Sequence, residues 1–193
     1  LKNFINLYES EYLKELFSLI FPEFDNIERL ERLKKIFNHS KINRDILLAT
    51  LLIGEKNNHE YFAHKYNISN DIKENLNLLS NDLKLIKENR DFFDKDLEKN
   101  IYLSNKNHLI NLNILNFVNN SKYKLKDFLE RFKKILRSKA HSFPIDGKHL
   151  IQSGMKEGPT LGKVLKVIED EWIKNGFKIS RERVKIIIAS NIS

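Results

Sequence analysis

The sequence contains no cysteine, only three prolines and six glycines, and no long apolar run. The absence of cysteine excludes a disulfide-stapled scaffold and thiolate metal sites. No apolar run approaches the roughly 18 residues of a membrane-spanning helix, and the mean hydropathy is −0.47. A basic and apolar N-terminal signal pattern is also missing, so we expect a cytoplasmic protein with no membrane partner.

Basic residues are in excess, and they are unevenly placed. The 193 residues include 34 Lys or Arg and 26 Asp or Glu, a formal net charge of +8. Residues 1–98 have a net charge of −3, whereas residues 99–193 have a net charge of +11. A local positive field collects polyanions, so the second half is the place to look for a nucleic-acid contact.

Apolar residues recur at helical spacing along most of the chain, and no Asn-Gly or Asp-Gly pair separates alternating strands. The run Ile46–Ile53 has Ala49 at its centre and no turn residue before Gly54, which favours a buried helix over a strand. The sequence therefore predicts an all-α protein, an irregular multi-helix bundle. The predicted helices are 13–21, 27–37, 44–53, 59–66, 70–79, 94–102, 106–118 and 125–137.

The best candidate for a domain boundary is the polar cluster Asn119-Asn120-Ser121, where the net charge along the chain changes from negative to positive. It predicts two parts, a helical body over residues 1–120 and a helical tail over residues 121–193.

The candidate catalytic and metal-binding patterns in the sequence lack the residue spacing or the local structure that their chemistry requires. His59 and His64 are five residues apart, so on a helix they point about 140° apart and share no metal; we expect them at the surface or at a helix cap. Asp94 and Asp96 resemble a two-metal carboxylate pair, but they follow Phe92-Phe93 in a helical region and fit an acidic first helical turn. Phosphate-loop, dinucleotide and nucleophile-elbow motifs are missing. The sequence predicts no catalytic residue and no metal ligand.

Five of the six glycines fall in the C-terminal window. Gly154 fits a helix end, Gly158-Pro159 fits the start of the next helix, and Gly162 would allow another backbone or a ligand to approach. That helix has an apolar stripe ending at Trp172. Its free N–H groups offer a seat for a phosphate. The flanking cations are Lys148, Lys156 and Lys163.

This window resembles the C-terminal motif of class II tRNA nucleotidyltransferases, the CCA-adding enzymes and the related bacterial poly(A) polymerases. His149 stands where that family has Asp. Further similarity, in the family's order, lies in Phe21-Pro22-Glu23, in 47–52 and in 62–70. The matching positions of the motif are Phe143, Pro144, Gly147, Leu150, Ile151, Gly154, Gly158, Pro159, Gly162, Leu165, Glu169 and Trp172.

The resemblance implies that this chain is the body and tail of such an enzyme. In that family the catalytic carboxylates, with Mg²⁺, CTP and ATP, belong to an N-terminal head upstream of anything matched here. The chain begins with Leu1 rather than Met, so we expect a piece of a longer protein, or a relative without the head, that is inactive by itself and holds no cofactor. The implied parent reaction, adding CMP and AMP to the 3′ end of tRNA, and poly(A) synthesis stay as alternatives.

For this piece the resemblance implies RNA binding, with the acceptor stem and T-arm of tRNA held by shape and by phosphates. In the basic segment 122–139, we expect Leu125, Phe128, Leu129, Phe132 and Leu136 to be buried. Tyr123 fits the edge of the core better than a base-stacking position. An alternative is a basic helical module that binds an acidic protein. The cations expected to meet phosphates are Lys126, Lys133, Lys134, Arg137, Lys139, Lys148, Lys156 and Lys163.

Overall fold

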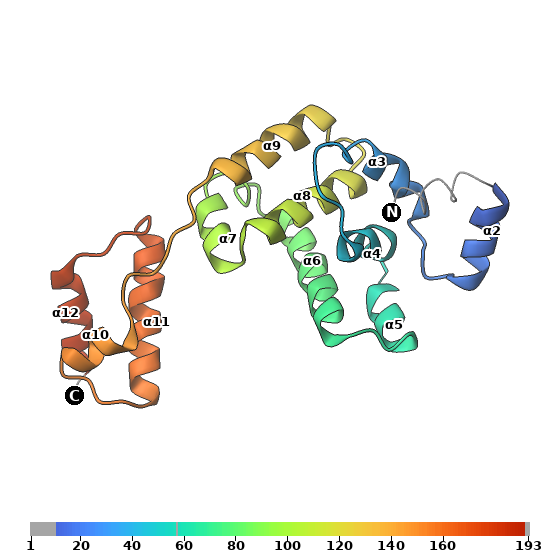
Figure 1. The fold of residues 1–193 in the computed structure, drawn as a ribbon. Helices are drawn as coiled ribbons and strands as arrows, with labels where there is room; N and C mark the ends of the chain where they lie inside the picture. Colours follow the sequence, from blue (N-terminus) through green and yellow to red (C-terminus); the bar gives the residue numbers. More distant parts are fainter. Residues whose placement is uncertain (1–10, 57, 192–193) are drawn as a thin grey trace. The chain divides into compact units, whose positions relative to one another are not determined.

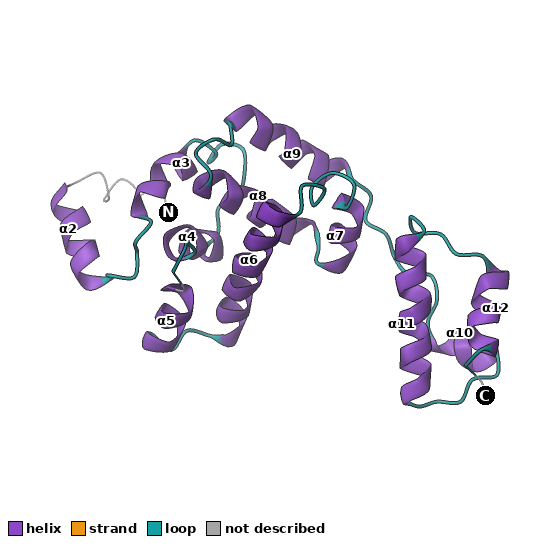
Figure 2. Ribbon diagram, turned by 180° about the vertical axis from the view of Figure 1, so that it is seen from behind, coloured by secondary structure: helices purple, strands orange, loops and turns teal. Residues whose placement is uncertain are grey.

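The computed structural model describes residues 11–56 and 58–191. In these residues the chain forms eleven α-helices and one short 3-10 helix, with no strand among them (Figures 1 and 2). The predicted all-α class is confirmed. No described helix combines the length and the apolar character that crossing a membrane requires.

The chain divides into two compact units, the first ending at Ser138 and the second beginning at Lys139. The first unit contains α2 (Glu11–Ile20), η1 (Ile27–Arg29), α3 (Leu30–Lys34), α4 (Arg44–Leu52), α5 (Asn58–Lys65), α6 (Asn70–Glu88), α7 (Leu97–Leu103), α8 (Lys106–Asn119) and α9 (Leu125–Arg137). The second unit contains α10 (Gly147–Gln152), α11 (Pro159–Lys174) and α12 (Arg181–Ala189).

Helix α8 is the centre of the first unit, because it contacts α3, α4, α6, α7 and α9. Its buried residues lie on every side of the helix, as in a helix enclosed by its neighbours. Leu109, Leu112 and Ile114 are completely buried. Asn113 is buried too, and both ends of its amide are bonded: Nδ2 donates to the Phe128 carbonyl and Oδ1 accepts from the Tyr123 hydroxyl.

The division between the units differs from the predicted boundary at Asn119-Asn120-Ser121. Those residues form the turn between α8 and α9, and the two helices pack against each other in one core. Phe117 of α8 and Phe128 of α9 are in ring contact, with centroids 5.2 Å apart. The polar composition therefore marks a surface turn inside one unit.

The second unit has a small core of its own. Leu150, Val164 and Ile168 are buried together with Ile187 and Ile188 of α12. Helix α12 is not among the helices predicted above; its signals are Ser180, whose hydroxyl accepts from the backbone N–H of Arg183 as an N-cap, and the apolar pair Ile187-Ile188.

An aromatic cluster lies beside that core, around Trp172. The Trp172 ring is 5.3 Å from Phe143 and 5.0 Å from Phe177, measured between centroids. The ring of Phe177 is stacked on the imidazole of His141 at 3.7 Å. The buried position of Trp172 agrees with the apolar stripe predicted for this helix.

Several helix ends differ from the prediction. Helix α6 continues to Glu88, because Leu83 and Ile86 extend its apolar stripe. Helix α7 begins at Leu97, so Asp94 and Asp96 lie in the preceding turn and not in a first helical turn. The predicted helix 27–37 is shorter, a 3-10 turn followed by α3.

His59 is buried, contrary to the prediction of a surface or cap position, whereas His64 is exposed. His59 is 4% exposed, and the Nδ1 atom of its ring has no hydrogen-bond partner among the described residues. Burial lowers the pKa of this imidazole, because the charged form loses its hydration.

A lowered pKa at His59 makes stability depend on pH. The unfolded chain takes up this proton near the ordinary pKa of 6.5, while the folded chain does so only at lower pH. Stability is therefore complete above the unfolded pKa and is lost as the pH falls through the window below it. We expect His59→Leu to have a flatter decline of unfolding free energy between about pH 7.5 and about pH 5 than the wild type. Urea titrations at each pH measure this; His64→Leu, at the exposed histidine, is the control and should keep the wild-type decline.

Candidate nucleic-acid interface

Helix α9 is held on the first unit by one strongly apolar face. Phe128 and Ile135 are completely buried, and Leu125, Leu129 and Phe132 pack against the same core. The predicted burial of Leu136 is wrong, because this side chain is 49% exposed. Ile135 takes the core position, since it lies three residues after Phe132 and seven after Phe128 on the face turned toward α8.

Arg32 of α3 fixes the turn that leads into α9. Its guanidinium donates to the carbonyls of Phe117 at 2.9 Å, Asn120 at 3.0 Å and Tyr123 at 2.8 Å. It also lies 4.4 Å above the Phe117 ring. Burial lowers the pKa of Arg32. Arginine side chains nevertheless stay charged in proteins. Nothing in the sequence singles out this arginine, because its partners are backbone carbonyls far along the chain.

Tyr123 and Arg131 complete the attachment of α9. Tyr123 is a core residue, as predicted: it is buried, and its hydroxyl donates to Asn113 Oδ1 at 2.9 Å. Burial raises the pKa of this phenol to about 12. The Arg131 guanidinium lies over the rings of Phe93, at 4.5 Å, and Tyr123, at 4.8 Å. Arg131 is therefore occupied in packing, unlike the other cations of this helix.

The outer face of α9 carries a row of exposed cations. Lys133, Lys134 and Arg137 line a shallow depression of about 410 Å³, together with Glu130 and Ser138. Lys134 is paired with Asp94 at 2.6 Å, and this pair lowers the pKa of the Asp94 carboxyl. No described residue forms an ion pair with Lys133 or Arg137. These three cations are called the α9 cation row below.

Two further lysines have contacts at the two ends of α9. Lys126, near its start, is exposed and lies 3.9 Å from Glu130, a weak surface pair. Lys106, the first residue of α8, donates from Nζ to the Leu136 carbonyl at 2.8 Å. The last turn of α9 therefore has a cation on one of its free carbonyl groups.

The predicted cations of the second unit are all exposed, and they lie on different elements. Lys148 lies on α10, Lys163 on α11 and Lys139 in the segment before α10. Lys156 lines a pocket of about 310 Å³ at the start of α11, together with Thr160 and Asn191. Of the three cations predicted to surround the phosphate seat, only Lys156 lines this pocket.

The glycine motif shapes the chain entering α11. Gly154 has φ 97° and Gly158 has φ 147°, values that residues with a side chain rarely adopt. Pro159 is the first helical residue, as predicted. No other described backbone approaches Gly162, since a Cβ built there would have no atom within 4 Å outside its own helix; an approach by a ligand stays a prediction.

The remaining motif residues have structural places. Gly147 begins α10, and a Cβ on it would lie 3.3 Å from Leu161, so the two helices meet closely there. Phe143 packs against the second core, whereas Pro144 is exposed and lines a pocket beside α10.

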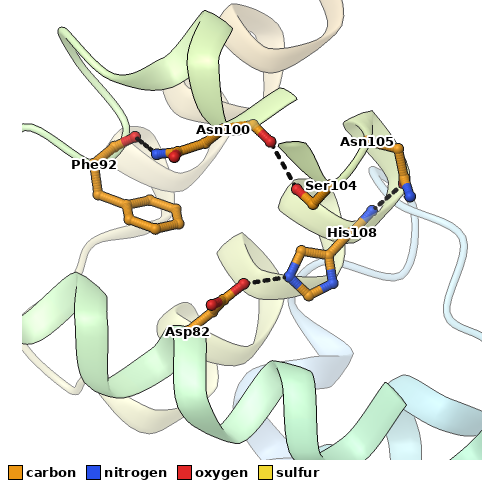
Figure 3. Close-up of polar contacts among 6 residues, drawn as sticks. All are labelled: Asp82, Phe92, Asn100, Ser104, Asn105 and His108. Carbon is orange, nitrogen blue, oxygen red and sulfur yellow. Dashed lines mark hydrogen bonds and ion pairs between the residues drawn. The ribbon is translucent and has the colours of Figure 1, made fainter. Parts of the chain in front are cut away.

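A histidine–carboxylate pair in the first unit connects two helices (Figure 3). His108 Nε2 lies 2.7 Å from Asp82 Oδ2, and the backbone N–H of His108 donates to the Asn105 side chain at the start of α8. The neighbouring hydroxyl, Ser104 Oγ, is bonded to the Asn100 carbonyl, and the Asn100 amide donates to the Phe92 carbonyl. The Asp82–His108 contact ties α6 to the start of α8, whereas the Asn100 bonds hold α7 to its own last turn and to the turn that precedes it. Among the described residues, no group of three His, Asp or Glu side chains is placed to hold a metal ion.

Comparison of the chain with protein-family models, curated proteins and solved structures finds no match.

Proposed function

We propose that this chain is the RNA-holding helical part of a tRNA nucleotidyltransferase of the CCA-adding type, which grips the acceptor stem and T-arm through phosphates. The observation that carries the proposal is the α9 cation row, exposed on a helix whose other face is fixed in a core. The order of the resembling motifs supports the same assignment. In that family the metal ions and the nucleoside triphosphates bind to an N-terminal head, which these residues do not match. We therefore assign only RNA binding to this chain.

The chemistry of the row suits an RNA helix. A-form RNA exposes phosphates and 2′-hydroxyls along a wide, shallow groove, and cations on a rigid helix contact these groups without reading bases. Lys133 and Arg137 are one helical turn apart, and the guanidinium is able to bind a phosphate with two parallel hydrogen bonds. Each phosphate that is neutralised releases counterions, so binding weakens as the salt concentration rises.

The double variant Lys133→Glu/Arg137→Glu tests the proposal. We expect it to bind a tRNA transcript roughly ten-fold more weakly at moderate salt, because it loses two phosphate contacts. The slope of log K against log salt should fall by roughly 1.5, since each contact contributes about 0.7–0.9. Filter binding over a series of salt concentrations measures both quantities.

The matched control is Lys73→Glu/Lys87→Glu, two exposed lysines of α6 with the same change in net charge. It should keep nearly the wild-type slope. Equal slopes for the two double variants would show that the row has no special role. Heparin at matched charge tests the alternative of a basic protein-interaction module, which predicts no preference for folded tRNA.

A further inference from the structure

The second unit contains a pocket of about 500 Å³ between α10 and α12 that the proposed function does not use. Its floor is apolar, because Leu150 and Ile188 belong to the second core and are 0% and 3% exposed. Val184 packs partly against the same core and lines the pocket. The volume lies within the roughly 300–1,000 Å³ of small-ligand pockets.

The rim of this pocket is positively charged. Arg181 and Lys185 lie one turn apart on α12, both are exposed, and neither has an ion pair or a side-chain hydrogen bond with a described residue. No acidic side chain lines the pocket. The adjacent Glu182 has a lowered pKa, first because its carboxylate accepts hydrogen bonds from its own backbone and from Ser180, and to a smaller extent because Lys185 and Arg181 are near. The pocket therefore combines an apolar floor with two cations that an anion is able to pair with.

His149 supplies a polar edge. Its Nδ1 lies 2.8 Å from Asp146 Oδ1, and this contact lowers the pKa of the Asp146 carboxyl. The ionised carboxylate only accepts hydrogen bonds, so Nδ1 carries the proton and Nε2 is the ring nitrogen left for a ligand. A neutral imidazole in this state accepts a hydrogen bond from an amino group at Nε2.

We infer that this pocket binds an unpaired nucleotide of the RNA, with the base against the apolar floor and its phosphate on Arg181 and Lys185. The inference deepens the proposed function and rests on it. Bases that are not paired or stacked are the parts of RNA that proteins take into pockets, by contact with a ring face and by hydrogen bonds to a base edge. The floor, the edge and the rim supply these contacts in the same pocket.

Filling the pocket is the direct test. Val184→Phe adds volume on the floor without a change of charge, and Lys185→Glu reverses one rim cation. We expect each variant to weaken binding of a tRNA transcript, with its unpaired loops, about five-fold or more, since one base contact is worth at least that much. Binding of a fully paired RNA duplex of equal phosphate number should be unchanged by Val184→Phe. Lys178→Glu, an exposed lysine outside the pocket, is the control for Lys185→Glu.

The outcomes separate this inference from the proposed function. An equal loss for tRNA and duplex with Val184→Phe, or no loss for either, overturns the pocket while leaving the α9 cation row in place. If the wild type binds neither RNA, the proposed function fails first. Competition by a leucine-containing polyglutamate peptide that is relieved by Val184→Phe, with tRNA binding unaffected, would assign the pocket to an acidic protein instead. Far-UV circular dichroism establishes that Val184→Phe is folded; if it is not, Lys185→Glu against Lys178→Glu decides.

Discussion

Replacing Arg32 with Met is expected to destabilise the first unit by about 3 kcal/mol. The substitution keeps an apolar stem in the same space but removes every donor of the guanidinium. The carbonyls of Phe117 and Tyr123 are then left without this partner at a partly buried place. The contact with the Phe117 ring is lost as well.

The chain offers a clean way to measure this loss. Trp172 is its only tryptophan and lies in the second unit, so its fluorescence reports that unit alone. Helix content measured by circular dichroism comes mostly from the first unit. In urea, Arg32→Met should move the ellipticity transition to lower denaturant and leave the fluorescence transition in place.

Arg32→Lys is the matched control. It keeps the charge but replaces the planar fork by a single ammonium, so it reaches fewer of the carbonyls. We expect it to lose roughly half as much stability as Arg32→Met. If both variants unfolded at the same urea concentration as the wild type, the hydrogen bonds from Arg32 to the α8–α9 turn would contribute nothing to stability.

Ile168→Ala is expected to unfold the second unit at room temperature. Ile168 is completely buried at the centre of a small core, and truncation of a buried Ile costs about 3 kcal/mol. Domains of about 60 residues are only marginally stable, so the second unit has little reserve. Trp172 emission should shift to the wavelength of exposed indole without denaturant, while the ellipticity transition of the first unit remains.

Val167→Ala is the control for this experiment, because Val167 is the preceding residue of α11 and is 51% exposed. It should change stability by no more than about 0.5 kcal/mol. A wild-type fluorescence transition in Ile168→Ala would contradict the assignment of a separate second core.

The fold class and most helices followed from periodicity because a buried apolar stripe leaves a regular trace in the sequence. Phe128, Leu129 and Phe132 of α9 were predictable in this way. Helix ends were less so, as α6 shows: its last two turns depend on Leu83 and Ile86 finding a core that only the tertiary structure supplies. Leu136 and Ile135 differ by one position on a helix, a rotation that the sequence alone does not fix.

The predicted cations are exposed, but the sequence does not indicate which of them lie close together in space. Lys133 and Arg137 were findable as neighbours on one helix, since four residues make one turn. The pairing of Lys134 with Asp94 spans forty residues, and the clamp of Arg32 ends on backbone atoms, which carry no sequence signal. The same holds for the pocket beside α12, whose wall comes from a helix that was not predicted.

The bond from Lys106 to the Leu136 carbonyl changes the electrostatic field around the α9 cation row. The carboxyl end of a helix behaves as about half a negative charge, concentrated on its free carbonyls. Such a pole, beside Arg137, would repel the phosphates that the row attracts. The Lys106 ammonium group bonded to one of those carbonyls opposes the pole where it is strongest, so on the proposed function Lys106 would assist the approach of the RNA from a neighbouring helix.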